Sequence, residues 1–568
     1  MSDRSARRLA GVPLLACALL APSAAAQAPA AIVRTGTIRD SLRAGKRMTA
    51  VRVSAPPRID GKLDDAVWAS APVARDFTQK DPVEGARPTD QLEVRFVYDD
   101  VALYVATRVT LSKPRVIQAP LGRRENIGQA EHIWVSFDTY GDERTAYSFG
   151  VSASGVRGDW YHPGDNETNI DTSFEPVWQA ASDITAQGWT AEMRIPFSQL
   201  RFNDADVQRW GVNVDYWTPS TNEDVFWIPV PKKETGWSSW MGQLAGISGI
   251  HPTRRLELLP YAASEATARA TRDPANPFDD GRNVKPRVGG DLKMGIGPGL
   301  TLQATVNPDF GQVEADPAVV NLSAFETIFP ERRPFFVEGS QLLMGGGANY
   351  FYSRRIGARP RGAASGEFID YPQATTILGA AKITGRLPSG TSVGLLTALT
   401  GQEEARLFDG TTRAITERVV APRTGYLVGR LQQQFGPNAS TAGVSLTGVA
   451  RQFGDATYLR DRYDARAWTG GGDFNYRFDR NTYNIQGFLG GSYVQGDTLA
   501  ITALQRSSAR YFQRPDRALG GEGWFRSGLL NSSYRPGATD LRGLATYLRV
   551  AKDGGAFNWE AQANVRTP

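Results

Sequence analysis

Residues 470–495 read GGGDFNYRFDRNTYNIQGFLGGSYVQ, and this stretch decides the fold of the second half of the chain. Phe474, Tyr476 and Phe478 fall on one face of an extended strand, while the residues between them are polar. A tight turn at 479–481 then starts a second alternating segment. Strands of about ten residues with one apolar and one polar face are typical of a transmembrane β-barrel.

The same alternation extends outward from this hairpin in both directions. We expect eleven strands, at 254–264, 286–297, 299–306, 375–387, 391–400, 423–435, 440–451, 467–478, 482–494, 541–551 and 556–567. Tight turns alternate with long polar stretches at 265–285, 307–374, 401–422, 452–466 and 495–540. Short turns at one end of the strands and long loops at the other favour the barrel over the alternative, a soluble β-sandwich. Because single-chain bacterial barrels close with an even number of strands, we expect further strands beyond Pro568.

The first half of the chain differs from the second in its Trp content and in the length of its strands. Segment 51–250 contains ten of the 13 Trp residues, and its strands are short, as at 92–98 and 132–137. Short alternating strands punctuated by Gly, Pro and Asp predict an antiparallel, immunoglobulin-like β-sandwich. The chain is therefore expected to be all-β, with a linker at 27–50 before the sandwich. The barrel would occupy 251–568 and carry the long insert 307–374.

The N-terminus has the features of an export signal. Three Arg residues precede the apolar run 9–20, which leads into an Ala-rich cleavage site, and this pattern predicts a signal peptide over 1–26. The alternative is a lipobox that ends at Cys17, the one Cys of the chain, which would then carry a lipid. Either signal directs the chain to the envelope. We expect it in the outer membrane of a Gram-negative-type bacterium, in contact with lipid and with the sandwich in the periplasm.

Composition excludes several classes of protein. The chain of 568 residues has 64 Lys and Arg against 59 Asp and Glu, and its Arg residues are scattered, so nucleic acid is not an expected partner. A single Cys excludes a disulfide scaffold, and three widely spaced His residues form no zinc motif. Two carboxylates are enough for a glycosidase, but no such pair stands out, so catalysis stays open with binding favoured.

Five motifs resemble two known families. The stretches 58–68 (RIDGKLDDAVW), 98–105 (YDDVALYV) and 188–197 (GWTAEMRIPF) resemble the family-9 carbohydrate-binding module. The stretches 307–317 (NPDFGQVEADP) and 329–339 (FPERRPFFVEG) resemble a bacterial outer-membrane family of unassigned function that joins such a module to a barrel. These resemblances imply a sandwich that binds glycans and contributes to polysaccharide capture, catabolism or uptake.

Two other functions are compatible with the same sequence. One is an outer-membrane glycoside hydrolase that acts on O-glycosyl bonds and uses the sandwich to deliver substrate. The other is an envelope assembly or signalling protein whose sandwich binds no sugar. The fold alone does not decide among these functions, because one fold hosts many activities.

Sugar recognition needs flat rings that stack on pyranose faces. Trp160 and Tyr161 lie in a predicted polar loop at 155–173, where rings have no core to fill, and they are the first candidates, followed by Trp178 and Trp217. The alternative is that these rings are part of the core, as Trp usually is in a small sandwich.

The same loop is rich in hard oxygen donors. Asp159, Asp165, Glu167 and Asp171 are candidate ligands for a structural Ca²⁺, which the resemblance to the family-9 module also favours, and a solvated acidic loop is the alternative. The barrel motif holds three more carboxylates that could bind a cation or cap turns, Asp309, Glu314 and Asp316. The insert that follows is expected to fold into the barrel lumen as a plug.

Overall fold

The computed structural model describes residues 38–172, 174–251, 256–268, 273–279, 281–297, 299–308, 326–345, 350–387, 389–436, 438, 440–479, 482–508, 510, 512, 534–553 and 557–567. The predicted signal peptide 1–26 with Cys17, and the carboxylates Asp309, Glu314 and Asp316, lie outside the described residues. The chain divides into two compact units, Met1–Ala44 and Gly45–Pro568. The first includes the short helix α1 (Ile38–Arg43), and the second contains the strands described below.

Twelve strands from the first half of the chain form one hydrogen-bonded sheet. They are β1 (Arg47–Arg52), β2 (Thr78–Asp81), β3 (Gln91–Tyr98), β4 (Ala102–Thr110), β5 (His132–Asp138), β6 (Ala146–Ser152), β7 (Arg157–His162), β8 (Gln179–Thr185), β9 (Gly188–Pro196), β10 (Trp210–Thr218), β11 (Glu223–Phe226) and β12 (Gly242–Ala245). The first half of β1 pairs with β12 and its second half with β3, both in parallel. Strand β1 therefore joins two antiparallel layers, β7-β6-β5-β10-β12 and β3-β4-β9-β8, which form a β-sandwich.

Three details differ from the sequence-based expectation. Strand β1 begins at Arg47, inside the stretch 27–50 that was expected to be a linker. Its two parallel pairings interrupt a sheet that was expected to be antiparallel throughout. The predicted polar loop 155–173 contains strand β7, which pairs with β6. Both strands are only six residues long, too short for alternation alone to distinguish them from loop.

The core of the sandwich is aromatic. Strand β5 is buried along its whole length, and its Phe137 lies 6.2 Å, centroid to centroid, from Phe96 of β3. Because β3 and β5 belong to different layers, this contact places the two rings between them. Burying a side chain of this kind contributes about 1.5–3 kcal/mol, so the aromatic content of segment 51–250 accounts for a stable sandwich.

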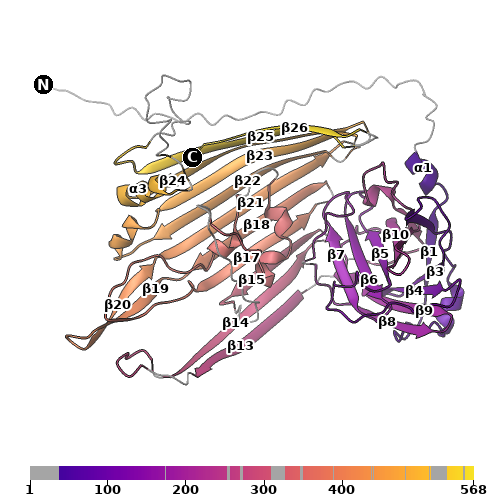
Figure 1. The fold of residues 1–568 in the computed structure, drawn as a ribbon, viewed down its shortest axis with the longest axis horizontal. Helices are drawn as coiled ribbons and strands as arrows, with labels where there is room; N and C mark the ends of the chain where they lie inside the picture. The colour runs from indigo at the N-terminus through magenta and orange to yellow at the C-terminus, as the bar shows by residue number, and fades with distance from the viewer. Residues whose placement is uncertain are drawn as a thin grey trace. The chain divides into compact units, whose positions relative to one another are not determined.

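Eleven long antiparallel strands form the second large sheet, and they are neighbours in the order of the sequence (Figure 1). They are β13 (Leu256–Ala268), β14 (Arg282–Ile296), β15 (Leu300–Val306), β17 (Ile377–Arg386), β18 (Thr391–Thr400), β21 (Arg423–Phe435), β22 (Ser440–Gln452), β23 (Arg466–Phe478), β24 (Tyr483–Gln495), β25 (Asp540–Lys552) and β26 (Trp559–Arg566). The predicted fold class, a β-sandwich followed by a barrel-like antiparallel sheet, is confirmed.

Burial in this long-stranded sheet is the reverse of the usual pattern. Val444 and Leu489 are 59% and 60% exposed, whereas Lys382 is 1% exposed. Arg430 and Asp473 form an ion pair on the buried face, with their side chains 4% and 7% exposed. Apolar side chains therefore occupy the exposed face of the sheet, and the charged side chains of Lys382, Arg430 and Asp473 lie on the buried face.

In the insert 307–374, the described residues Phe336, Leu343 and Ile356 pack on the buried face of this sheet. The insert carries α2 (Pro334–Val337), the 3-10 helices η4 (Ser340–Leu343) and η5 (Ser353–Arg355), and β16 (Phe368–Asp370). Phe336 and Leu343 from the insert join Leu396 and Val428 of the sheet in one apolar cluster. The two short helices α2 and η4 are thereby held against β18 and β21.

A small third sheet was not expected from the sequence. Strand β16 pairs with β19 (Glu403–Asp409), and β19 pairs with β20 (Ala414–Ala421). The hairpin of β19 and β20 falls in the stretch 401–422, which was expected to be a loop. Near the other end of the chain lies helix α3 (Thr498–Arg506). No helix in the described part of the chain is both long and apolar enough to span a membrane.

Candidate functional site

Trp160 and Tyr161 lie side by side on strand β7, so their rings point to opposite faces of the sheet. The Trp160 ring stacks on that of Trp134, with the centroids 3.6 Å apart, and its indole N–H donates to Nε2 of His162. Tyr161 lies opposite Tyr147 of β6, and these two ring centroids are 5.1 Å apart. The structure therefore separates two residues that were predicted to act together.

The other two predicted sugar-binding rings lie elsewhere. Trp178 is 1% exposed, and its indole N–H donates to Asp159 Oδ1 over 2.9 Å, so it belongs to the core. Trp217 is half-buried on β10 opposite His132, which places it on the same face as Trp134. Tyr161 is the member of the predicted set that lines the cavity described below.

The four acidic residues predicted as calcium ligands do not come together. Asp165 is buried and accepts hydrogen bonds from two backbone N–H groups of a neighbouring turn. Glu167 forms an ion pair with Lys80, with Nζ and Oε2 2.6 Å apart. Asp171 pairs through its backbone with β7 and lines the cavity, whereas Asp159 is part of a different acidic cluster.

That cluster consists of Glu125, Asp159 and Glu175, which each place a carboxylate oxygen within 4.8 Å of the others. Burial, followed by the charges of Glu175 and Asp159, raises the pKa of Glu125 to about 7. Burial also raises the pKa of Asp159. Asp159 Oδ2 and Glu125 Oε1 are buried and have no hydrogen-bond partner in the described part of the chain. Three carboxylates with two unpartnered oxygens fit Ca²⁺, which takes oxygen ligands.

A cavity of about 200 Å³ is lined by residues of the sandwich and of the long-stranded sheet. Its aromatic lining consists of Tyr140, Tyr147, Tyr161, Phe174 and Phe197. The centroids of Tyr147 and Phe174 lie 5.0 Å apart with the planes at 49°, so Tyr161, Tyr147 and Phe174 form one continuous group of rings. Both tyrosines come from the strand pair β6–β7, whose register sets them opposite each other.

Two ion pairs flank the cavity. Lys293 of β14 pairs with Glu338, which follows α2, with Nζ and Oε1 2.6 Å apart. Burial alone would raise the pKa of Glu338, but the charges of Lys293, Lys382 and Arg201 together outweigh it, so that pKa lies below its ordinary value. Arg386 of β17 pairs with Asp142, from the turn between β5 and β6. Each ion pair leaves both of its charges neutralised.

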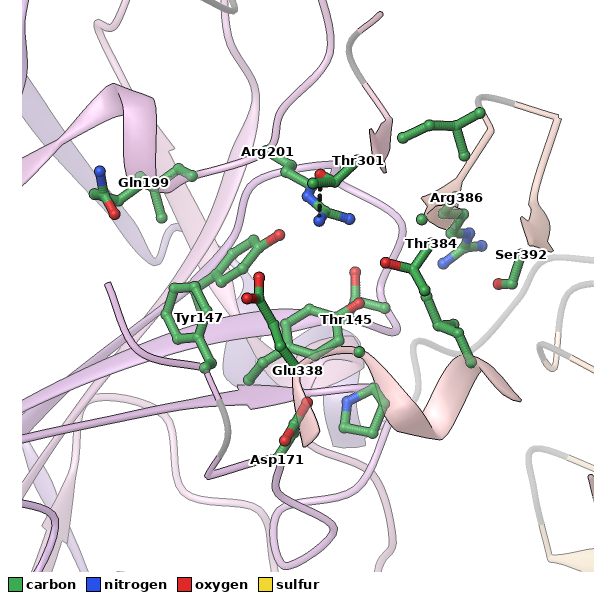
Figure 2. A pocket seen from close by; sticks show the side chains of 18 of the residues that line it. Thr145, Tyr147, Asp171, Gln199, Arg201, Thr301, Glu338, Thr384, Arg386 and Ser392 are labelled. Carbon is green, nitrogen blue, oxygen red and sulfur yellow. Dashed lines mark hydrogen bonds between the residues drawn. The ribbon is translucent and has the colours of Figure 1, made fainter. Parts of the chain in front are cut away.

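Two further guanidinium groups line the cavity and contact neutral partners. Arg201 donates to the Thr301 hydroxyl over 2.7 Å, as Figure 2 shows. Arg144 donates to the amide oxygen of Gln434 over 3.0 Å. Figure 2 also shows Glu338 and Tyr147, which line the same cavity. The site thus combines apolar rings with charged and neutral hydrogen-bonding groups.

Most of these lining residues were not predicted from the sequence. Tyr147 had a detectable signal, because Tyr147, Phe149 and Val151 alternate with small residues along β6. In the folded chain Tyr147 lies opposite Tyr161 across the strand pair. Arg201 and Thr301 are 100 positions apart, and Glu338 comes from a short helical segment of the insert. No periodic pattern links residues so far apart, so their meeting could not be deduced from spacing.

Comparisons with known proteins gave one family match and several structural neighbours. Residues 252–515 match a family described as a domain of unknown function (DUF5916). No curated protein matches the chain. A family-9 carbohydrate-binding module from Caldicellulosiruptor kristjanssonii, solved with glucose, is 15% identical with a TM-score of 0.26, covering 36% of this chain and 97% of that one.

Two other solved structures are also similar. The same module solved with cellotriose is 16% identical with a TM-score of 0.27, covering 36% of this chain and 95% of that one. A BenF-like porin from Pseudomonas fluorescens is 10% identical with a TM-score of 0.16, covering 87% of this chain and 90% of that one. The modules and the porin are thus distant in sequence from this chain.

Proposed function

We propose that this protein binds a saccharide in the cavity lined by Tyr147, Tyr161 and Phe174. Sugars are bound by rings that stack on their apolar faces and by polar groups that hold their hydroxyls. The observation that carries the proposal is that both kinds of group line one cavity of about 200 Å³. Ligand pockets for drug-sized molecules measure ~300–1,000 Å³, so we expect a single sugar ring or the end of a chain.

The sequence of the sandwich supports the same ligand class. Its motifs at 58–68, 98–105 and 188–197 resemble the family-9 carbohydrate-binding module. Binding at this position would hold the sugar against residues of the long-stranded sheet, such as Lys293 and Thr301. Such a site suits capture of a glycan that then passes to the barrel-like part of the chain.

Calorimetric titration of the full chain in detergent with a panel of mono- and oligosaccharides tests the proposal. We expect saturable binding, and we expect Tyr161→Ala to weaken it at least tenfold because one wall of the cavity is lost. Trp160→Ala is the matched control, since its ring lies on the opposite face of the same strand. Loss of binding in Trp160→Ala but not in Tyr161→Ala would move the site to the other face and contradict the proposal.

We also infer that the long-stranded sheet lies in the bacterial outer membrane, with the sandwich in the periplasm. The sheet exposes residues such as Val444 and Leu489 and buries the ion pair of Arg430 and Asp473. Water would penalise that arrangement, whereas hydrocarbon outside and a polar interior favour it. The export signal predicted over residues 1–26 supports the same location.

A structural calcium ion is a further proposal for the cluster of Glu125, Asp159 and Glu175. Three carboxylates held this close repel one another, and a divalent cation would neutralise them. The ion would be held by these three side chains beside β7. It would stabilise the fold.

A further inference from the structure

We propose that the saccharide bound in this cavity is acidic, and that its carboxylate binds the guanidinium groups of the cavity lining, those of Arg201 and Arg144. The inference rests on the proposed function, because it names the class of sugar that the same cavity takes. Both arginines contact neutral partners, and a buried hydroxyl in the same cavity has no hydrogen-bond partner among the described residues.

Arg201 has no ion-pair partner of its own among the described residues. The charge of Glu338 acts on it, but that carboxylate already forms an ion pair with Lys293. It follows the 3-10 helix η2 (Phe197–Gln199), and its guanidinium donates to the Thr301 hydroxyl, a neutral partner. Among the residues described, no carboxylate lies within ion-pair distance of it. A guanidinium has five N–H donors, so a single hydroxyl leaves most of them available to a ligand.

Arg144, on the sandwich side of the cavity, also forms no ion pair with any described residue. Its guanidinium donates to the amide oxygen of Gln434 over 3.0 Å, and this partner is also neutral. Burial and the nearby charges of Arg386 and Arg477 lower the pKa of Arg144, and Asp142 offsets only part of this effect. An anion placed beside Arg144 would offset the rest.

The other charges along the cavity are matched. Lys293 is paired with Glu338, and Arg386 is paired with Asp142. Of the remaining acids, Glu175 contacts Arg124 at 3.2 Å. Asp171 lies within electrostatic range of Lys382. Glu338 thus acts on both Lys293 and Arg201, and Asp142 acts on both Arg386 and Arg144. At each of these two carboxylates the positive charges outnumber the negative one.

One further group lacks a partner. The hydroxyl of Tyr140 is buried and makes no hydrogen bond to any described residue, although Tyr140 lines the same cavity. A buried hydroxyl left in this way costs about 1–3 kcal/mol unless a ligand satisfies it. A sugar carboxylate offers acceptor oxygens to this O–H and to the planar N–H fork of each arginine, for which its geometry is matched.

Glucose, glucuronate and the methyl ester of glucuronate are nearly equal in size, so comparing their affinities separates the effect of charge from that of shape. Titrated into the full chain, glucuronate should bind at least tenfold more tightly than glucose or the ester. Raising the NaCl concentration from 0.05 to 0.5 M should weaken glucuronate binding more than glucose binding, because salt screens the charge pairing.

Substitutions of the two arginines test whether they cause the preference for glucuronate. Arg201→Gln and Arg144→Gln should each reduce the glucuronate-to-glucose affinity ratio at least fivefold. Arg201→Lys should keep more of that ratio than Arg201→Gln, because lysine supplies the positive charge but not the planar pair of N–H donors. Arg209→Gln, at an exposed position of the sandwich, is the control and should keep the ratio. Circular dichroism of each variant checks that the fold is retained.

The outcomes distinguish this inference from the proposed function. Equal affinity for the three sugars would overturn the acidic specificity and leave saccharide binding in place. A preference for glucuronate that survives both arginine substitutions would overturn the assignment to Arg144 and Arg201. Saturable binding of none of the panel sugars would overturn the proposed function, and the inference with it.

Discussion

Glu192 of β9 is fully buried, and both of its carboxylate oxygens accept hydrogen bonds. Oε1 accepts from the indole N–H of Trp68 over 2.8 Å, and Oε2 accepts from the backbone N–H groups of Asp60 and Gly61. Trp68, Asp60 and Gly61 belong to the motif at 58–68, and Glu192 belongs to the motif at 188–197. At the scale of single residues, one carboxylate therefore joins two motifs far apart in the sequence.

Glu192→Gln should destabilise the sandwich by about 1–3 kcal/mol. The amide keeps one acceptor but turns an NH₂ group toward N–H donors, so at least one buried donor loses its partner. Urea unfolding followed by Trp fluorescence measures the change, and the exposed Glu234→Gln is the control. A variant as stable as the wild type would show that these hydrogen bonds contribute little.

Glu125 gives a prediction about pH. Its pKa is about 7 in the folded chain, above the ordinary value of 4.5, so the folded state binds more protons than the unfolded state between those pH values. Stability should therefore fall as pH rises from about 4.5 to 7 and level off above it. With a chelator present to remove divalent cations, Glu125→Gln should be more stable than the wild type at pH 8, because the amide carries no charge. We expect a difference of about 1 kcal/mol, since solvent screens the charge of this half-exposed group.

Thermal unfolding at pH 4 and pH 8 tests this, and the two proteins should unfold at the same temperature at pH 4. Adding Ca²⁺ at pH 8 should then raise the midpoint of the wild type more than that of Glu125→Gln, because the variant loses a ligand. A wild-type midpoint that does not respond to Ca²⁺ would contradict the proposed ion site at Glu125, Asp159 and Glu175.

At the scale of elements, the strands β5, β6 and β7 hold the Trp134 ring flat against two glycines. A Cβ atom added to Gly150 would lie 2.6 Å from the ring of Trp134, and one added to Gly158 would lie 2.7 Å from it. Because these contacts are closer than real Cβ atoms allow, the ring fills the space where side chains would stand. The Trp160 ring then stacks on the free face of Trp134.

Gly150→Ala should destabilise the sandwich by about 1–3 kcal/mol, because the methyl group forces the Trp134 ring to move. The near-ultraviolet circular dichroism band of the Trp134–Trp160 pair should also change. Gly164→Ala is the matched control, since a Cβ there meets nothing within 4 Å. Equal stability of the two variants would mean that Trp134 is not packed against Gly150.

The same elements show what sequence reasoning could reach. The predicted strands 391–400 and 423–435 coincide with β18 and β21, because alternation is strong where one face of a long strand is buried. The hairpin of β19 and β20 was missed because most of its side chains are exposed on both faces and show little alternation. The cavity was missed for another reason: its residues meet only after the long-stranded sheet and the sandwich have formed.

At the scale of the whole molecule, the two large sheets place their apolar residues differently. The sandwich buries its apolar residues in the usual way, as Phe96 and Phe137 show. The long-stranded sheet exposes its apolar residues, and Lys382, Arg430 and Asp473 are buried on its other face. One chain therefore combines a sandwich that buries its apolar side chains with a sheet that exposes them, which is the pattern behind the membrane proposal.

Val444→Arg tests the membrane proposal, since Val444 is 59% exposed on the apolar face of β22. In lipid bilayers the variant should be less stable by about 2–4 kcal/mol if the position lies near the bilayer midplane. Thr416→Arg, on the exposed hairpin strand β20, is the control and should have little effect. Urea titration in liposomes measures both, and an unchanged Val444→Arg would contradict contact with lipid.

The most direct test of the central claim is a crystal structure of the full chain grown with a saccharide that binds in solution. The account predicts density for one sugar ring in the cavity, against Tyr147, Tyr161 and Phe174. A sugar seated beside Trp160 on the opposite face, with the cavity empty, would contradict it.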